Sequence, residues 1–118
     1  MAKKTNKNVI PLSMCAGQVS RINARHSLGL TTEDVQCYEG EVYVSTTKAA
    51  EFMRASFNIF SNQYVPAITG KKHGSYQWVR RMILGRSRWY AFSDLEKLLE
   101  LSVKENKSVF EICKAKPK

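Results

Sequence analysis

The sequence predicts a small α+β fold that is mostly helical and carries one short β-hairpin. Three observations indicate this. Apolar residues recur at helical spacing in several short segments, most of which follow a Ser or Thr that can cap a helix. An aromatic and β-branched stretch is interrupted by Gly85-Arg86-Ser87, which is typical of a hairpin tip. The 118 residues, of which 43% are hydrophobic, predict a single domain with a modest core.

The N-terminal third of the chain is predicted to lie outside the main domain. Residues 1–11 are polar and rich in Lys, so we expect a flexible basic arm that closes at Pro11. Residues 12–41 are predicted to form an N-terminal helical extension, in which a helix over 12–28 would end at Gly29. The apolar side of this helix would pack on the same domain or on a second subunit.

The main domain is predicted over residues 42–104 and opens with a strand and a helix. Glu39-Gly40 is a turn sequence, and the β-branched and aromatic residues at 41–44 predict a short strand after it. A Ser or Thr at 45–47 can cap a helix that runs to Arg54.

A second short helix is predicted over residues 57–64, with Ser56 as its cap. Pro66 should end or follow it, because the residue before a proline is disfavoured in helical geometry. The two helices and the short turn between them form a helix-turn-helix candidate.

A hairpin is predicted next, with strands at 77–84 and 88–92. A helix over 75–84 is an open alternative, because some apolar residues there also share a helical face. Ser93 and Glu96 have the spacing of a capping box and predict a last helix. Residues 105–118 are expected to be a tail with one further short helical turn.

In chain order, strand, helix, turn, helix, hairpin and capped helix is the order of a winged helix-turn-helix. The stretch Val44-Ser-Thr-Thr-Lys-Ala-Ala-Glu-Phe52 resembles the opening of MerR-like and phage excisionase-type DNA-binding domains. The stretch Gly85-Arg-Ser-Arg-Trp-Tyr-Ala-Phe-Ser-Asp-Leu-Glu-Lys-Leu-Leu99 resembles the wing and the following helix of the same group. The resemblance covers residues 42–101 and implies a winged helix-turn-helix fold with a small β-hairpin wing.

Charge is distributed unevenly along the chain, whose formal net charge is +9. Residues 52–93 contain none of the ten Asp and Glu, but seven of the nineteen Lys and Arg. Like charges this close repel one another and cost folding stability, whereas a polyanion would gain binding energy there by counterion release. The pattern therefore indicates a nucleic-acid partner.

The resemblance implies that the second helix faces the major groove, where Asn and Ser side chains can hydrogen-bond base edges. The wing arginines would meet phosphates or the minor groove, and the other cations would hold the DNA backbone without reading sequence. The predicted DNA-binding residues are Lys48, Ser56, Phe57, Asn58, Ser61, Asn62, Lys71, Lys72, Arg80, Arg81, Arg86, Ser87 and Arg88.

No catalytic, metal or cofactor site is predicted. The three cysteines lack metal-ligand spacing and are expected to be small buried hydrophobes. The chain has no Gly-rich phosphate loop and no local signature of a catalytic triad. No apolar run approaches the roughly 18 residues of a membrane span, and the basic start lacks the apolar stretch of a signal peptide. We expect a cytoplasmic, DNA-associated protein.

The expected function is sequence-specific binding of double-stranded DNA, without catalysis. The protein would be an excisionase-type recombination or architectural factor, or a transcriptional regulator, of a phage or mobile element. A single module buries roughly 600–1,000 Å², so a homodimer or cooperative oligomer on DNA is expected, with a recombinase as a candidate protein partner. Two alternatives remain open: an RNA-binding protein, and a protein-interaction module that inhibits a host or viral factor.

Overall fold

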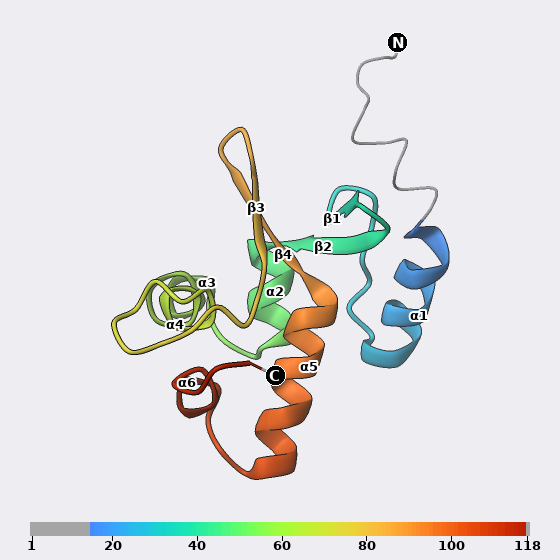
Figure 1. Cartoon of the computed structure of the whole chain (residues 1–118). Helices are drawn as coiled ribbons and strands as arrows, with labels where there is room; N and C mark the ends of the chain where they lie inside the picture. The colour runs from blue at the N-terminus through green and yellow to red at the C-terminus, as the bar shows by residue number, and fades with distance from the viewer. Residues whose placement is uncertain (1–14, 118) are drawn as a thin grey trace.

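The computed structural model describes residues 15–117 and shows a small α+β domain built on a curled, four-stranded antiparallel sheet (Figure 1). The arm predicted at 1–11 lies outside the described residues. The strands are β1 (Val35–Tyr38), β2 (Glu41–Ser45), β3 (Arg81–Leu84) and β4 (Ser87–Ala91), in the spatial order β1-β2-β4-β3. The helices are α1 (Ala16–His26), α2 (Thr46–Phe52), α3 (Phe57–Ile59), the π-helical η3 (Phe60–Tyr64), α4 (Val65–Ile68), α5 (Phe92–Glu105) and α6 (Val109–Ile112).

Strands β1 and β2 form a tight hairpin, of which the sequence predicted only the turn and the second strand. Glu39 (φ 52°) and Gly40 (φ 79°) both have positive φ, as a type I′ turn requires. Because β1 pairs with β2 along its length, the boundary expected between residues 41 and 42 falls inside one hairpin. Residues 12–41 are therefore not a purely helical extension.

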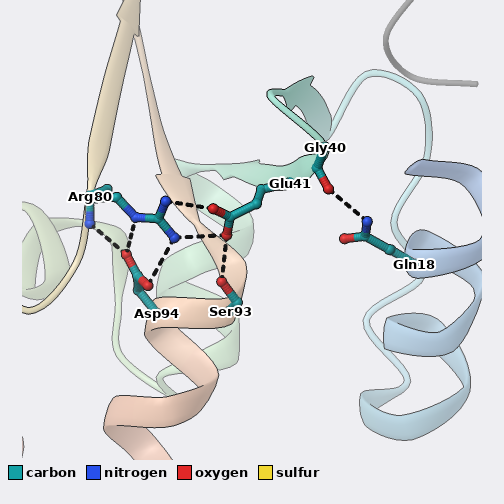
Figure 2. Close-up of polar contacts among 6 residues, drawn as sticks. All are labelled: Gln18, Gly40, Glu41, Arg80, Ser93 and Asp94. Atoms are coloured by element: carbon teal, nitrogen blue, oxygen red, sulfur yellow. Dashed lines mark hydrogen bonds and ion pairs between the residues drawn. The ribbon is translucent and has the colours of Figure 1, made fainter. Parts of the chain in front are cut away.

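Helix α1 occupies the middle of the predicted helix 12–28 and is attached to the domain at both ends. Near its start the Gln18 side chain donates a 2.7 Å hydrogen bond to the carbonyl of Gly40 (Figure 2). At its end Arg25 and His26 contact the carboxylate of Glu96 in α5, at 3.1 and 2.7 Å. Burial alone would raise the pKa of Glu96, but the hydrogen bonds from these two partners outweigh it and hold the pKa below its ordinary value.

All three cysteines are buried, as expected, but two of them are joined in a disulfide that was not predicted. Cys15 and Cys37 link the start of α1 to β1. Cys113 is free, and burial raises the pKa of its thiol to about 11. Structural disulfides persist in oxidising compartments. The disulfide therefore does not support the expected cytoplasmic location, which stays a prediction.

The caps predicted for the two helices of the helix-turn-helix are confirmed. Ser45 Oγ accepts the backbone N–H of Lys48 at 3.2 Å and starts α2. Ser56 Oγ accepts the N–H of Ile59 at 3.2 Å and starts α3. Each cap satisfies one of the N–H groups that a helix leaves without a partner.

The turn between these helices is a Schellman motif. The N–H of Ala55 donates to the carbonyl of Ala50 at 3.0 Å, and the N–H of Arg54 donates to the carbonyl of Glu51 at 3.1 Å. Arg54 has φ 60° and occupies the left-handed position in which glycine is usual. The motif fixes the direction in which the second helix leaves α2.

The second helix continues past Pro66, so the expectation that the proline ends it was wrong. Segments α3, η3 and α4 follow one another without a break over residues 57–68. Within η3 the N–H of Val65 reaches back five residues to the carbonyl of Phe60. Pro66 therefore comes directly after the wider π turn, at the start of α4, and Val65 keeps helical angles (φ −58°, ψ −46°). We refer to this stretch as helix 57–68.

The predicted hairpin is confirmed, but its first strand begins at Arg81 and not at 77, and its second strand spans Ser87–Ala91 and not 88–92. Residues 75–84 do not form the alternative helix. Its turn has only two residues, Gly85 and Arg86, because Leu84 pairs directly with Ser87. Gly85 has φ 59° and Arg86 is not left-handed, the combination that a type II′ turn needs. The hairpin of β3 and β4, called the wing below, projects beyond the helices (Figure 1).

Helix α5 begins at Phe92, so the capping box predicted for Ser93 and Glu96 is not formed. Strand β4 leads directly into the helix, and Ala91 occupies the N-cap position. Ser93 Oγ instead donates to Glu41 at 2.8 Å, and Glu96 bonds to α1.

The turn expected after residue 105 is confirmed as α6. It carries a capping box that was not anticipated, formed by Ser108 and Glu111. Helix α6 packs on α4 and α5.

The main core lies on one face of the sheet and joins the wing to helix 57–68. The buried ring of Phe60 meets the buried ring of Tyr90 in β4 edge-on, with centroids 5.5 Å apart. A smaller cluster of Tyr43, Trp89 and Ala91 covers the opposite face. Among residues 15–117, no helix has the length and apolarity needed to cross a bilayer.

Candidate nucleic-acid interface

The register of the wing decides which of its side chains share a face. Cross-strand partners point to the same side of a sheet, and neighbours along a strand alternate. Tyr90, which contacts Phe60 of helix 57–68, pairs with Arg81. Arg88 lies two residues before Tyr90 and pairs with Ile83. Arg81, Ile83 and Arg88 therefore lie on the side of the sheet that carries helix 57–68.

The end of the wing is open to solvent. Arg86, Ser87 and Arg88 are exposed, whereas Arg81, nearer the body, is half-buried. The two-residue turn places Arg86 at the tip, where its guanidinium can approach an anion without obstruction from the body of the domain.

Polar side chains follow the first half of helix 57–68. Asn58 and Asn62 are exposed and Ser61 is half-buried. Gln63 is also exposed and was not among the predicted contacts, although its amide has the same hydrogen-bonding capacity as that of Asn62. The hydroxyl of Ser56 already serves as the helix cap, so its role in the structure is to hold this helix.

Two large apolar side chains interrupt the polar ones. Phe57 exposes 53% and Ile59 45% of their surface at the start of helix 57–68. These two side chains are therefore not part of the core. Such side chains can contact thymine methyl groups or an apolar surface of a protein.

The loop after helix 57–68 carries two exposed lysines and is tied to the end of that helix. The backbone N–H groups of Lys71 and Lys72 both donate to the carbonyl of Pro66, at 2.9 Å. Gly70 has φ 78°, and a Cβ atom there would lie 2.7 Å from the backbone N of Gln77. Only glycine fits this close approach, so the loop has a defined path.

Arg80 forms ion pairs within the domain, so we do not include it in the candidate interface. Its guanidinium bonds to Glu41 through two nitrogens, at 2.5 and 2.7 Å, and to Asp94 at 2.8 and 3.1 Å (Figure 2). The backbone N–H of Arg80 also donates to Asp94 at 3.0 Å. We call Glu41, Arg80, Ser93 and Asp94 the wing-base network, because it connects the segment entering β3 to β2 and to the start of α5.

The wing-base network shifts two acid–base equilibria. The hydrogen bonds that Arg80 donates to Asp94 and Glu41 raise the pKa of Arg80 above its ordinary value. The hydrogen bond from Arg80 holds the pKa of Glu41 below its ordinary value, against the opposing effect of burial. Both shifts favour the charged forms of these groups. The positive charge of Arg80 is neutralised by the two carboxylates, so it would attract a phosphate only weakly.

Lys48 is also used internally. Its ammonium donates to the carbonyl of Leu28 at 2.9 Å and lies 3.4 Å from the carboxylate of Glu51. It connects α2 to the segment that follows α1, and the proposed interface does not include it.

Residues 52–93, called the acid-free window below, remain largely unneutralised in the folded chain. Of its seven Lys and Arg, all within the described residues, only Arg80 has a carboxylate within 4 Å. One of the remaining six, Arg54, was not among the predicted contacts, although it is exposed in the helix-turn-helix turn. These six cations, called the free cations below, are Arg54, Lys71, Lys72, Arg81, Arg86 and Arg88.

Within residues 15–117, no group of three His, Cys, Asp or Glu is placed to hold a metal ion. Searches against protein-family models, curated proteins and solved structures gave no match for this chain.

Proposed function

We propose that this protein is a winged-helix protein that binds double-stranded DNA through helix 57–68 and the wing, without catalysis. The observation that carries the proposal is the sheet order β2-β4-β3, with both helices of the helix-turn-helix between β2 and β3 in the sequence. This topology brings the wing beside helix 57–68, and the free cations lie on these elements and their connections. The proposal includes the MerR-like or excisionase-type winged helix expected from the sequence.

In the proposed complex, helix 57–68 enters the major groove. Asn58 and Asn62 present amides, which can bond to adenine through two hydrogen bonds, and Ser61 can bond to several base edges. Arg86 and Arg88 contact phosphates at the wing, while Lys71 and Lys72 hold the backbone at the other end of the helix. We propose a role in recombination, DNA architecture or transcription, with two or more copies bound to neighbouring sites because one module has a small footprint.

Affinity measurements on paired charge variants test the proposal. The double variant Arg86→Gln/Arg88→Gln removes two free cations from the wing, and Lys97→Gln/Lys104→Gln removes two exposed cations from α5 as a matched control. Fluorescence anisotropy with DNA chosen by selection from random duplexes should show at least about tenfold weaker binding for the wing variant. Equal weakening by both variants would mean that only net charge matters, and the proposed interface would be wrong.

A second function is favoured by the exposed Phe57 and Ile59. A surface helix that exposes two large apolar side chains suits a protein partner. In this alternative, Phe57→Ser/Ile59→Ser would abolish binding of the protein partner, while Arg86→Gln/Arg88→Gln would leave that binding unchanged. The same four substitutions therefore distinguish the two proposals.

A further inference from the structure

A hollow of about 530 Å³ opens beside the second half of helix 57–68. This volume is within the range of roughly 300–1,000 Å³ typical of small-ligand sites. The hollow is lined by Asn62, Gln63, Pro66, Lys72 and Phe110. Of these residues, only Asn62 and Lys72 belong to the proposed duplex interface. Duplex binding therefore gives no role to the amide of Gln63 or the ring of Phe110.

The walls of the hollow are held in place by packing and backbone hydrogen bonds. Phe110 lies on α6 and meets the ring of Tyr64 edge-on at 4.9 Å, and Tyr64 in turn stacks on the buried Phe60 at 5.9 Å. Lys72 is fixed at its backbone by the bond to Pro66. The hollow is therefore formed before any ligand arrives.

The π-helical segment lies at this hollow. It includes Asn62 and Gln63, whose exposed amides line the opening. π-Helical turns inside α-helices occur frequently at functional sites. This backbone feature is an observation separate from the chemistry of the side chains.

We propose that the hollow binds one unpaired nucleotide of the DNA. The base would stack on Phe110, the amides of Asn62 and Gln63 would bond to its edge, and the ammonium of Lys72 would meet its phosphate. In the free protein the Phe110 ring is half-buried, and the exposed Lys72 places its ammonium over the ring, 5.9 Å from the ring centre. On binding, the base replaces the ammonium over the ring, and the ammonium moves to the phosphate.

A nucleotide matches all three kinds of group in the hollow. Every base has a face that stacks on an aromatic ring and an edge that both donates and accepts hydrogen bonds. A carboxylate would satisfy Lys72 but would leave the ring and the amide oxygens without partners. The inference builds on the proposed function, because the same DNA that lies along helix 57–68 supplies the nucleotide.

Four DNA probes test the inference at one salt concentration: a blunt duplex, the same duplex with a three-nucleotide 3′ or 5′ overhang, and the duplex with a single-base bulge. We expect at least one unpaired probe to bind about tenfold more tightly than the blunt duplex, since base stacking on an aromatic residue has an effect of this order. Phe110→Leu should remove the preference and leave blunt-duplex affinity unchanged. Tyr38→Leu, at an exposed aromatic residue on β1, is the matched control and should keep the preference.

Fluorescence of 2-aminopurine placed at the unpaired position reports stacking independently of affinity. It should change on binding to the wild-type protein and to the control Tyr38→Leu, and change less with Phe110→Leu, whose folding is checked by circular dichroism. Equal affinity for all four probes, or a preference that survives Phe110→Leu, would overturn the inference while duplex binding stands. A single strand with the overhang sequence is tested as well. If this strand binds and Phe110→Leu weakens its binding, while the blunt duplex does not bind, the inference about the hollow is supported and the proposed function is not. Absence of binding to every probe would reject both.

Discussion

Replacing Arg80 should weaken the fold, whereas replacing the neighbouring wing arginines should weaken only DNA binding. In Arg80→Gln, Glu41 and Asp94 lose the cation that lies between them and are left as two carboxylates close together. The Arg80 side chain is about half exposed, so solvent screens the loss. Two partly exposed ion pairs of this kind contribute about 1–2 kcal/mol together. The expected fall in melting temperature is about 4–8 °C.

Thermal unfolding followed by circular dichroism measures this effect, with Arg86→Gln as the control. Both variants lose one positive charge, but Arg86 is at the wing tip and has no carboxylate partner among the described residues. Arg86→Gln should therefore melt within about 1 °C of the wild type, since surface changes away from specific contacts alter stability little. If the two variants melt at the same temperature, the wing-base network is not stabilising and the reasoning fails.

The pH dependence of the same difference gives a second check. The pKa of Glu41 is lowered in the folded state, so its contribution to stability is present above the ordinary Glu value of 4.5 and is lost as the pH falls through the folded value. The stability gap between wild type and Arg80→Gln should be constant from neutral pH to about 5 and should shrink below 4.5. A gap that stays the same in strong acid would contradict the proposed ion pairs.

Two further predictions concern the backbone and the cysteines. Gly70→Ala should lower the free energy of unfolding by about 2 kcal/mol in urea titrations, because the new Cβ would meet the backbone of Gln77 in a left-handed conformation; an unchanged midpoint would show that the loop can move aside. Iodoacetamide should label no cysteine in the native protein, one (Cys113) after denaturation without reductant, and three after reduction. Reduction of the Cys15–Cys37 disulfide should destabilise the fold by about 3 kcal/mol; labelling of all three without reductant would show that the disulfide is absent.

Local signals predicted many elements well because their causes are local. Ser45 and Ser56 cap helices through hydrogen bonds within three residues. Glu39 and Gly40 in one turn, and Gly85 in the other, supply the positive φ angles that these turns need. The capping box at Ser93 failed for a nonlocal reason, because Glu41, far away in sequence, takes the hydroxyl of Ser93.

The charge pattern of the sequence also could not reveal which arginines form ion pairs, because those pairs are long-range contacts. Arg80 and Arg88 look alike in the sequence, since both lie in the acid-free window. Folding brings Glu41 and Asp94, both outside that window, to Arg80 alone. The course of the second helix depended on a π-type hydrogen bond around Pro66, which apolar periodicity does not encode. The disulfide was missed for the same reason, because its cysteines are 22 residues apart and meet only after β1 joins the sheet.

The salt dependence of duplex binding tests the central claim, that the free cations of the wing and of the segments on either side of helix 57–68 contact the DNA backbone. Each phosphate contact contributes about −0.9 to the slope of log K against log salt concentration. Contacts by most of the free cations predict a slope of about −4 for wild type and about −2 for Arg86→Gln/Arg88→Gln. A slope near zero, or an equal slope for both proteins, would contradict the claim.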